Sequence, residues 1–184
     1  MHRRPNANEL LRHDANPVTP LTLIKKRACH ISARSRVGAP PERVYGILAD
    51  YNTGHPSILP SAFTKLTVEK GGVGAGTTIS FELRLLGRAR RYRASVTEPE
   101  PGRVLMERIL DNDAVTTFRV DPGALRNESD VTITTKVMVW PGVVGQIQGF
   151  VLTWLLESLY RKELSLLRRR VKGRSSSSSG ARVG

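Results

Sequence analysis

The middle of the chain alternates between apolar and polar residues, and a long helical pattern follows it. The first alternating segment runs from Ile31 to Val37, with Arg34 and Arg36 among its polar positions. A period of two predicts a strand with one buried and one exposed face. Six further segments have the same strand character: Phe63–Lys70, Thr77–Leu85, Arg88–Val96, Arg103–Leu110, Val115–Asp121 and Val131–Val139.

Short stretches rich in glycine, proline, aspartate and asparagine separate these segments. Such residues favour tight turns, and seven strands joined by short turns predict a mostly antiparallel, strongly curved sheet. A short helix is expected after the first strand, because Pro40-Pro41-Glu42 suits a first helical turn.

The last patterned segment, from about Pro141 to Val171, predicts one long helix whose apolar residues form two adjoining stripes. The first stripe contains Val143, Ile147, Phe150, Val151 and Trp154, and the second contains Leu152, Leu155, Leu156, Leu159, Leu166 and Leu167. This arc is wider than contact with one sheet face requires, so we expect it also to meet the short helices, a ligand or a second subunit. One sheet and one long helix can enclose a cavity, which favours a ligand-binding protein over a metalloenzyme or a nucleic-acid reader.

Few residues offer metal or redox chemistry. Cys29 is the only cysteine, so an internal disulfide and a thiol set for zinc are both excluded. No group of His, Cys, Asp and Glu shows metal-ligand spacing, and we expect neither a metal nor another cofactor. Residues 1–28 lack the continuous apolar segment of a secretory leader, and Gly149–Leu156 is too short to span a bilayer. These features predict a cytoplasmic protein without a transmembrane segment.

The net charge of +13 falls mainly on the two ends of the chain. Residues 1–30 hold six basic and two acidic residues, or +4, and residues 168–184 hold six basic residues and no acidic one, or +6. Residues 31–167 therefore keep only +3. This distribution predicts solubility and non-specific attraction to anions rather than a shaped binding face, so no specific nucleic-acid partner is expected.

The composition divides the chain into three parts. Residues 1–27 mix polar residues with three prolines and predict a disordered N-terminal extension. Residues 28–172 carry the strand and helix patterns of one domain. Residues 173–184, which include Ser175–Ser179, predict a flexible Ser-rich tail.

Several short motifs lie in the first half of the domain. They are Ala39-Pro40-Pro41-Glu42-Arg43-Val44-Tyr45, Leu48-Ala49-Asp50-Tyr51, His55-Pro56, Ile58-Leu59-Pro60 and Gly71-Gly72-Val73-Gly74-Ala75-Gly76-Thr77. Together with Glu98-Pro99-Glu100-Pro101-Gly102 and the terminal helix, they resemble the START-like (SRPBCC) superfamily, most of all its bacterial polyketide cyclase/dehydrase branch. The resemblance covers roughly residues 30–170.

The resemblance implies an α+β helix-grip fold. In this fold a seven-stranded curved antiparallel sheet wraps around the long C-terminal helix, and two short helices follow the first strand. The resemblance also implies that residues 28–172 form a START-like domain, in which a lipid, isoprenoid, polyketide or other apolar molecule occupies the space between sheet and helix. Some members of the superfamily act catalytically in that space.

Inward positions of the strands and of the helix are expected to line this cavity. We select Phe63, Ile79, Phe81, Tyr92, Met106, Phe118, Ile133, Phe150 and Trp154. The alternative for each of them is that it fills a closed core. Tyr51, His55 and Tyr92 are candidate polar groups that would orient a ligand. His55 either serves as an acid–base group at the cavity mouth or fixes its own turn before Pro56, and no catalytic residue is assigned.

Four arginines occupy one predicted strand: Arg88, Arg90, Arg91 and Arg93. Alternation places Arg91 and Arg93 on one face and the other two on the face of Tyr92. An inward arginine would meet an anionic or carbonyl group of a ligand, or it would need a carboxylate partner. The alternative is a solvated sheet edge with cross-strand pairs, for example Arg91 with Glu82 or Glu107.

The glycine-rich stretch Gly71–Gly76 lies between two strands and lacks a following Lys-Ser/Thr, so it does not resemble a phosphate loop. We expect it to form a mobile hairpin lid over the cavity mouth.

Three functions are compatible with these patterns. The leading hypothesis is the binding of a small hydrophobic ligand (lipid, isoprenoid or polyketide-like) in the cavity. The second is a polyketide cyclase/dehydrase-type enzyme, in which the cavity would hold a reactive chain folded. The third is association with a membrane surface, a ribosome or RNA through the basic ends, where Arg168–Lys172 continues the last helix. Either a monomer or a homodimer suits all three.

Overall fold

The computed structural model describes residues 26–112 and 114–177. Their elements are, in chain order, β1 (Arg27–Val37), α1 (Pro41–Ala49), the 3-10 helix η1 (His55–Ile58), β2 (Phe63–Lys70), β3 (Thr78–Leu85), β4 (Arg88–Glu100), β5 (Val104–Ile109), β6 (Val115–Pro122), β7 (Ser129–Val139) and α2 (Gly142–Ser177). Most of the predicted N-terminal extension and the end of the predicted tail lie outside the described residues, whereas residues 173–177 continue α2.

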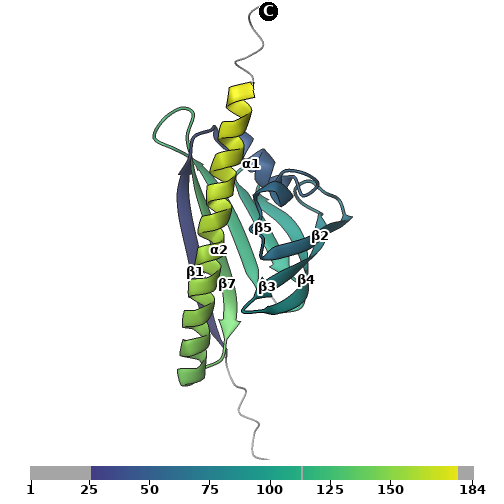
Figure 1. Cartoon of the computed structure of the whole chain (residues 1–184), viewed down its shortest axis with the longest axis vertical. Helices are drawn as coiled ribbons and strands as arrows, with labels where there is room; N and C mark the ends of the chain where they lie inside the picture. Colours follow the sequence, from purple (N-terminus) through teal and green to yellow (C-terminus); the bar gives the residue numbers. More distant parts are fainter. Residues whose placement is uncertain (1–25, 113, 178–184) are drawn as a thin grey trace, which may run out of the picture.

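The seven strands form one antiparallel sheet with the order β1-β7-β6-β5-β4-β3-β2. Strands β2 to β7 are neighbours in sequence order, as short turns require, and β1 pairs with β7. Leu86 and Gly87 join β3 to β4 with φ angles of 50° and 75°, which a two-residue hairpin turn favours. The α+β helix-grip fold predicted from the sequence is confirmed (Figure 1).

The core lies between the sheet and α2. Helix α2 packs against β1, β7 and η1, and its beginning lies near the end of β7, with α1 beside its C-terminal half (Figure 1). Among the largest fully buried residues are Ile31, Leu48, Ile58, Ile79, Leu105, Ile133 and Leu167. Ile79 and Ile133 thus face inward, but neighbouring side chains cover them completely. They are not among the residues that line the cavity between the sheet and α2, which corrects the prediction for these two residues.

Gly145 and Gly149 are buried on the side of α2 that faces the sheet. A Cβ atom on Gly145 would overlap the carbonyl oxygen of Trp140, and a Cβ on Gly149 would lie 3.8 Å from the Cys29 Sγ. Because this side of the helix approaches β1 closely, the large side chains of the first stripe point away from the sheet. Phe150 and Trp154, predicted to line the cavity, are 76% and 64% exposed. The prediction for these two residues is therefore corrected.

The register of β5 places Met106 on the outer face of the sheet. Leu105 pairs with Phe118, and both are buried, whereas Met106 pairs with Thr117 and is half-buried. Strict alternation then turns Glu107 inward. The prediction that Met106 faces the cavity is corrected, because the neighbouring charged residue takes the inward position.

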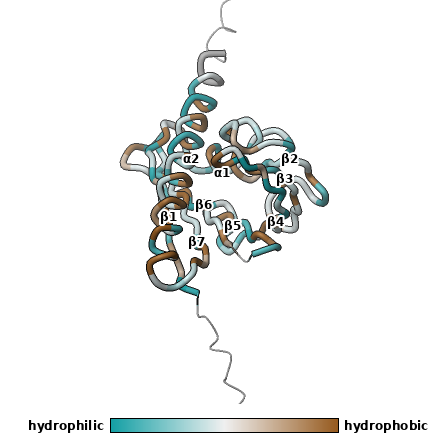
Figure 2. Tube along the Cα trace, turned by 60° about the horizontal axis from the view of Figure 1, so that its bottom comes forward, coloured by the Kyte–Doolittle hydropathy of each residue, from teal (hydrophilic) through white to brown (hydrophobic). Residues whose placement is uncertain are grey.

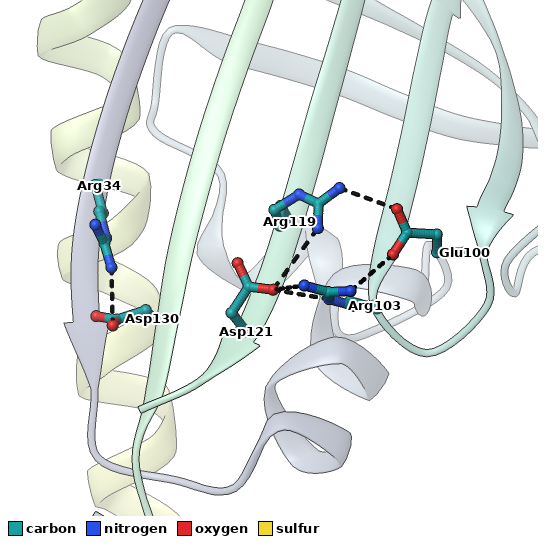
Figure 3. A network of polar contacts seen from close by, with 6 residues as sticks. All are labelled: Arg34, Glu100, Arg103, Arg119, Asp121 and Asp130. Atoms are coloured by element: carbon teal, nitrogen blue, oxygen red, sulfur yellow. Dashed lines mark hydrogen bonds and ion pairs between the residues drawn. The ribbon is translucent and has the colours of Figure 1, made fainter. Parts of the chain in front are cut away.

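Ion pairs cover the outer face of the sheet. Arg103 lies 2.7 Å from Asp121, Arg119 lies 3.0 Å from Glu100, and Arg34 of β1 pairs with a carboxylate of β7 in the same way (Figure 3). Such exposed pairs contribute little to stability. This face is a solvated surface, so the cavity and its chemistry lie on the opposite, α2-facing side.

No helix among residues 26–112 and 114–177 combines the length and the apolar content needed to cross a membrane.

Candidate functional site

A cavity of about 430 Å³ lies between the sheet and α2. Apolar and aromatic side chains form most of its wall, among them Phe63, Phe81, Leu83, Tyr92, Leu152 and Leu156. Aromatic rings of β2, β3 and β4 contact one another along this wall, with centroid distances of 5.7 Å and 5.9 Å. The volume and the lining are typical of a small-molecule site, for which the range is about 300–1,000 Å³.

The cavity has an open end and a closed end. Its exposed polar lining residues lie at the ends of strands and near the beginning of α2: Lys26, Arg90, Asp111, Asn112 and Gln148. Its buried polar lining residues are His55, Glu107, Thr135, Tyr160 and Glu163. A guest molecule would therefore enter past exposed polar side chains at the strand ends and meet buried polar groups at the bottom.

The turn after α1 holds His55 at the closed end. The carboxylate of Asp50 accepts hydrogen bonds from the Thr53 hydroxyl at 2.5 Å and from the Gly54 amide at 3.0 Å. These bonds close the turn, and the one to Thr53 is the main cause of the lowered pKa of Asp50. The His55 amide then donates to the Asp50 carbonyl at 2.6 Å. These main-chain bonds thus fix the backbone position from which the His55 side chain extends.

The ring of His55 is oriented by contacts on three sides. Its Nδ1 lies 2.7 Å from the carbonyl oxygen of Leu48, and because a carbonyl only accepts, Nδ1 carries the proton in this contact. The ring stacks on Tyr51 at 4.7 Å and meets the edge of Phe118 at 5.4 Å. In the neutral ring, Nε2 is then left with a free lone pair that points toward two carboxyl groups.

Two glutamates face the Nε2 atom of His55. Glu107 Oε1 lies 3.7 Å from it and Glu163 Oε1 lies 3.9 Å from it. Glu107 also accepts a hydrogen bond of 2.6 Å from the hydroxyl of Tyr51, which is fully buried behind it. Burial raises the pKa of Tyr51 well above its usual range, and the charge of Glu107 adds to this effect, so Tyr51 stays a hydrogen-bond donor at physiological pH.

Glu163 has the most unusual environment in the site. Its side chain is buried, and Oε1 has no hydrogen-bond partner among the described residues. Burial, and secondly the charge of Glu107, raises the pKa of Glu163 well above its ordinary value. Such a carboxyl group keeps its proton to higher pH than an exposed glutamate does, and while protonated it can both donate and accept a hydrogen bond. An unpaired polar atom in such a place is costly unless a ligand or water pairs with it.

A short chain of hydroxyl groups adjoins these residues. Thr116 Oγ1 lies 2.7 Å from Thr135 Oγ1, which in turn is hydrogen-bonded to the Tyr160 hydroxyl. Burial raises the pKa of Tyr160 to about 12. The closed end therefore combines neutral hydroxyl donors with a second group of residues, which we call the buried polar cluster: Tyr51, His55, Glu107 and Glu163. Within residues 26–112 and 114–177, no group of three or more His, Cys, Asp or Glu side chains suits a metal ion.

The structure brings five of the predicted site residues together on the cavity wall: His55, Phe63, Phe81, Tyr92 and Phe118. Tyr51 lies behind the wall and supports Glu107. For His55, both alternatives describe part of its environment: the Nδ1 side fixes the turn, and the Nε2 side faces the carboxyl groups. It lies at the closed end, however, and not at the mouth.

Sequence reasoning did not select Glu163, and it considered Glu107 only as a partner for an arginine. The signal for Glu107 is its position two residues from Leu105 and two from Ile109, both inward. The signal for Glu163 is its spacing from Leu156, Tyr160 and Leu167, which are buried on the same helix face. Burial of an unpaired charged residue costs free energy, so such a residue inside an apolar stripe is a candidate for a functional role.

The four arginines of β4 follow the predicted alternation. Arg93 pairs with Glu69 at 2.6 Å, and Arg91 donates to the Ser80 hydroxyl at 3.2 Å, both on the outer side. Arg90 lies on the inner side at the cavity mouth, with its guanidinium carbon 5.3 Å from the ring centre of Tyr92. It reaches the mouth but stays exposed, so it escapes the cost of burying an unpaired charge.

The glycine-rich stretch lies away from the cavity mouth. Gly72 accepts a hydrogen bond from the Tyr51 amide at 2.9 Å, and Gly74 donates to the Ala49 carbonyl at 2.9 Å. Val73 also forms a β-bridge with Asp50. These bonds attach the stretch to the end of α1, beside the closed end of the cavity. The prediction of a lid over the mouth is therefore corrected.

Comparisons with known proteins agree with this geometry. The sequence model of a family described as polyketide cyclase / dehydrase and lipid transport matches residues 28–172. Among solved structures, the KanY protein is 26% identical, with a TM-score of 0.66 over 80% of this chain and 99% of that one. A START superfamily protein of Mycobacterium smegmatis is 14% identical, with a TM-score of 0.63 over 79% and 98% of the two chains.

A third similar structure is larger. The di-domain ARO/CYC StfQ from the steffimycin biosynthetic pathway is 14% identical, with a TM-score of 0.66 over 81% of this chain and 52% of that one. A search of curated protein sequences gives no match.

Proposed function

Because this chain belongs to the polyketide cyclase / dehydrase and lipid transport family of START-like proteins, we propose that it binds one small, largely apolar molecule in its cavity. The guest carries a hydroxyl or carbonyl group, which meets the buried polar cluster. The observation that carries this proposal is the cavity itself: it measures about 430 Å³, is apolar along its wall, and ends at a carboxyl oxygen that has no hydrogen-bond partner among the described residues.

The apolar wall supplies the affinity. Removing apolar surface from water is worth about 25 cal/mol for each Å², and the rings of Phe63, Phe81 and Tyr92 offer a continuous surface for it. The polar end supplies the orientation. A neutral Glu163 can donate to a ligand carbonyl or accept from a ligand hydroxyl without the cost of burying a charge.

A competition experiment tests both parts of this proposal. The fluorescent probe N-phenyl-1-naphthylamine should bind one molecule per chain, and 1-decanol should displace it at a concentration about 5- to 10-fold lower than 1-chlorodecane does. The difference corresponds to one buried hydrogen bond, since both molecules bury the same alkyl chain.

The matched variant is Glu163→Met, which keeps the length of the side chain and removes its polar atoms. This variant should still bind the probe, and the two competitors should displace the probe from it at equal concentrations. Equal displacement from the wild-type protein would contradict the role of the polar cluster, and absence of probe binding would contradict the binding function itself.

The same cluster favours a second function, an enzyme of the cyclase or dehydrase type. His55 Nε2 lies within 4 Å of two carboxyl groups, and burial favours the protonated form of one of these, Glu163. In a dehydration, Nε2 would take a proton from carbon while Glu163 gives its proton to the departing hydroxyl, which leaves as water. Turnover of a poly-β-ketone that disappears in His55→Asn, with probe affinity retained, would favour this enzyme over a carrier.

A further inference from the structure

The first half of α2 and Trp140, which lies just before it, expose an unusual number of large apolar side chains. Trp140, Val143, Val144, Ile147, Phe150 and Trp154, called the apolar rim below, are between 48% and 76% exposed. The chain contains two tryptophans, and both are in this set. Apolar surface gathered in one place marks an interaction site more often than an ordinary solvent face.

The rim is confined to one part of the helix. From Gly142 to Leu156 the helix has no charged residue, and the charges begin at Glu157. Beyond that point its exposed positions are mostly charged, as at Arg161 and Arg168. Figure 2 shows the same change along α2, from brown in its first half to paler and teal colours in its second half. The second half is a normal solvated surface, and the first half has the composition of a surface in contact with an apolar phase.

The rim borders the mouth of the cavity. Gln148 and Leu152 lie between rim residues along the helix, and both line the cavity. Lys26, which also lines the mouth, places its Nζ atom 5.2 Å from the ring centre of Trp140. Two further exposed leucines adjoin mouth residues: Leu86 follows Leu85, and Leu110 precedes Asp111.

Basic side chains surround the same end of the sheet. Lys26, Arg27, Arg88 and Arg90 are exposed at the strand ends near the mouth, and Asp111 is the one acidic residue among the described mouth residues at that end. Aromatic and aliphatic side chains beside exposed cations are typical of surfaces that insert shallowly into anionic lipid. A symmetric contact between two copies of the chain would instead bring the cations of one copy close to the same cations of the other, and their repulsion would oppose the contact.

We propose that the apolar rim docks onto an anionic phospholipid bilayer, with the cavity mouth turned toward the lipid. Trp140, Ile147, Phe150 and Trp154 enter the interfacial layer, and the surrounding cations contact phosphate groups. An apolar guest then passes between bilayer and cavity without crossing water. This docking goes beyond ligand binding in the cavity, and the two are separable because the rim residues do not line the cavity.

Tryptophan fluorescence and vesicle sedimentation of the full chain test the docking. With vesicles of phosphatidylcholine and phosphatidylglycerol, the emission should shift to shorter wavelength, because both tryptophans lie in the rim, and brominated lipid should quench it. Vesicles of phosphatidylcholine alone should bind about 10-fold more weakly, since each cation near an anionic surface contributes to attraction.

Two double variants separate the apolar and the electrostatic parts. Ile147→Ser/Phe150→Ser and Arg27→Gln/Arg88→Gln should each lower partitioning into the anionic vesicles about 10-fold. The control is Leu125→Ser, because Leu125 is 65% exposed but lies in the β6–β7 loop at the opposite end of the sheet. All three should bind N-phenyl-1-naphthylamine like the wild type, so a failure of docking is distinguishable from a failure of ligand binding.

Two results would overturn the docking proposal. One is sedimentation that does not depend on anionic lipid or on the rim variants. The other is a dimer, detected by light scattering without lipid, that Ile147→Ser/Phe150→Ser converts to a monomer, because the rim would then be the contact between two copies.

Discussion

Replacing Leu152 with tryptophan should lower the affinity for N-phenyl-1-naphthylamine at least about 10-fold while the protein remains folded. Leu152 projects from α2 into the cavity wall and is half-buried. An indole at this position has empty space in front of it, so it occupies the volume that the probe needs. Overpacking of a filled core costs about 1–3 kcal/mol, and we expect a smaller loss of stability here because the cavity absorbs the added atoms.

The matched control is Val151→Trp. Val151 is adjacent in sequence but lies on the side of α2 that faces away from the sheet, where it is exposed. The same ring added there should leave the probe affinity unchanged. Equal loss in both variants would indicate a general disturbance of α2, and unchanged affinity in Leu152→Trp would show that the probe binds elsewhere.

Replacing Glu163 with glutamine should stabilise the protein at alkaline pH and leave its stability almost unchanged at acid pH. Burial and the charge of Glu107 raise the pKa of Glu163 well above its ordinary value of 4.5. In the unfolded chain this carboxyl loses its proton near the ordinary value, so above it the folded protein retains a proton that the unfolded chain has released. The free energy of unfolding of the wild type therefore falls by about 1.4 kcal/mol for each pH unit, until the folded carboxyl also ionises.

Glutamine does not titrate, so the two proteins should have similar free energies of unfolding near pH 4. The variant should then gain stability relative to the wild type as the pH rises, until the folded carboxyl of the wild type also ionises. Urea titrations at several pH values measure this difference. Glu157→Gln is the control on the same helix: its carboxylate pairs with Arg161 at the surface, and such a pair contributes about 0–1 kcal/mol. A difference between Glu163→Gln and wild type that is constant with pH would show that Glu163 is already ionised in the folded protein.

Periodicity was sufficient to predict the curved antiparallel sheet and the long helix because it reports local geometry, and the resemblance to the START-like superfamily supplied the helix-grip arrangement. The alternation in β1 and β3 and the short turns between strands leave few antiparallel arrangements, and α2 is unmistakable in length. Which side of α2 packs against the sheet was not predictable in the same way. Hydrophobicity favoured Phe150 and Trp154 as the inward side, whereas the structure turns Gly145 and Gly149 inward, and these residues carry no hydrophobic signal because they lack a side chain.

The cavity site shows a similar division. The aromatic residues Phe63, Phe81 and Tyr92 were identifiable because inward strand positions are regular. The buried polar cluster was only partly identifiable, because burial of Glu107 and Glu163 depends on contacts between β5, η1 and α2 that are distant in sequence. His55 was recognised as polar and central, but its orientation toward two carboxyl groups arises from the turn at Asp50 and the bond to Leu48.

Native mass spectrometry of the gently purified full-length chain tests most directly whether the cavity holds a guest. Binding in the cavity predicts a population heavier than the chain by one small molecule, which organic solvent extracts and which Leu152→Trp fails to retain. A bare chain mass, together with no measurable binding of N-phenyl-1-naphthylamine, would contradict it.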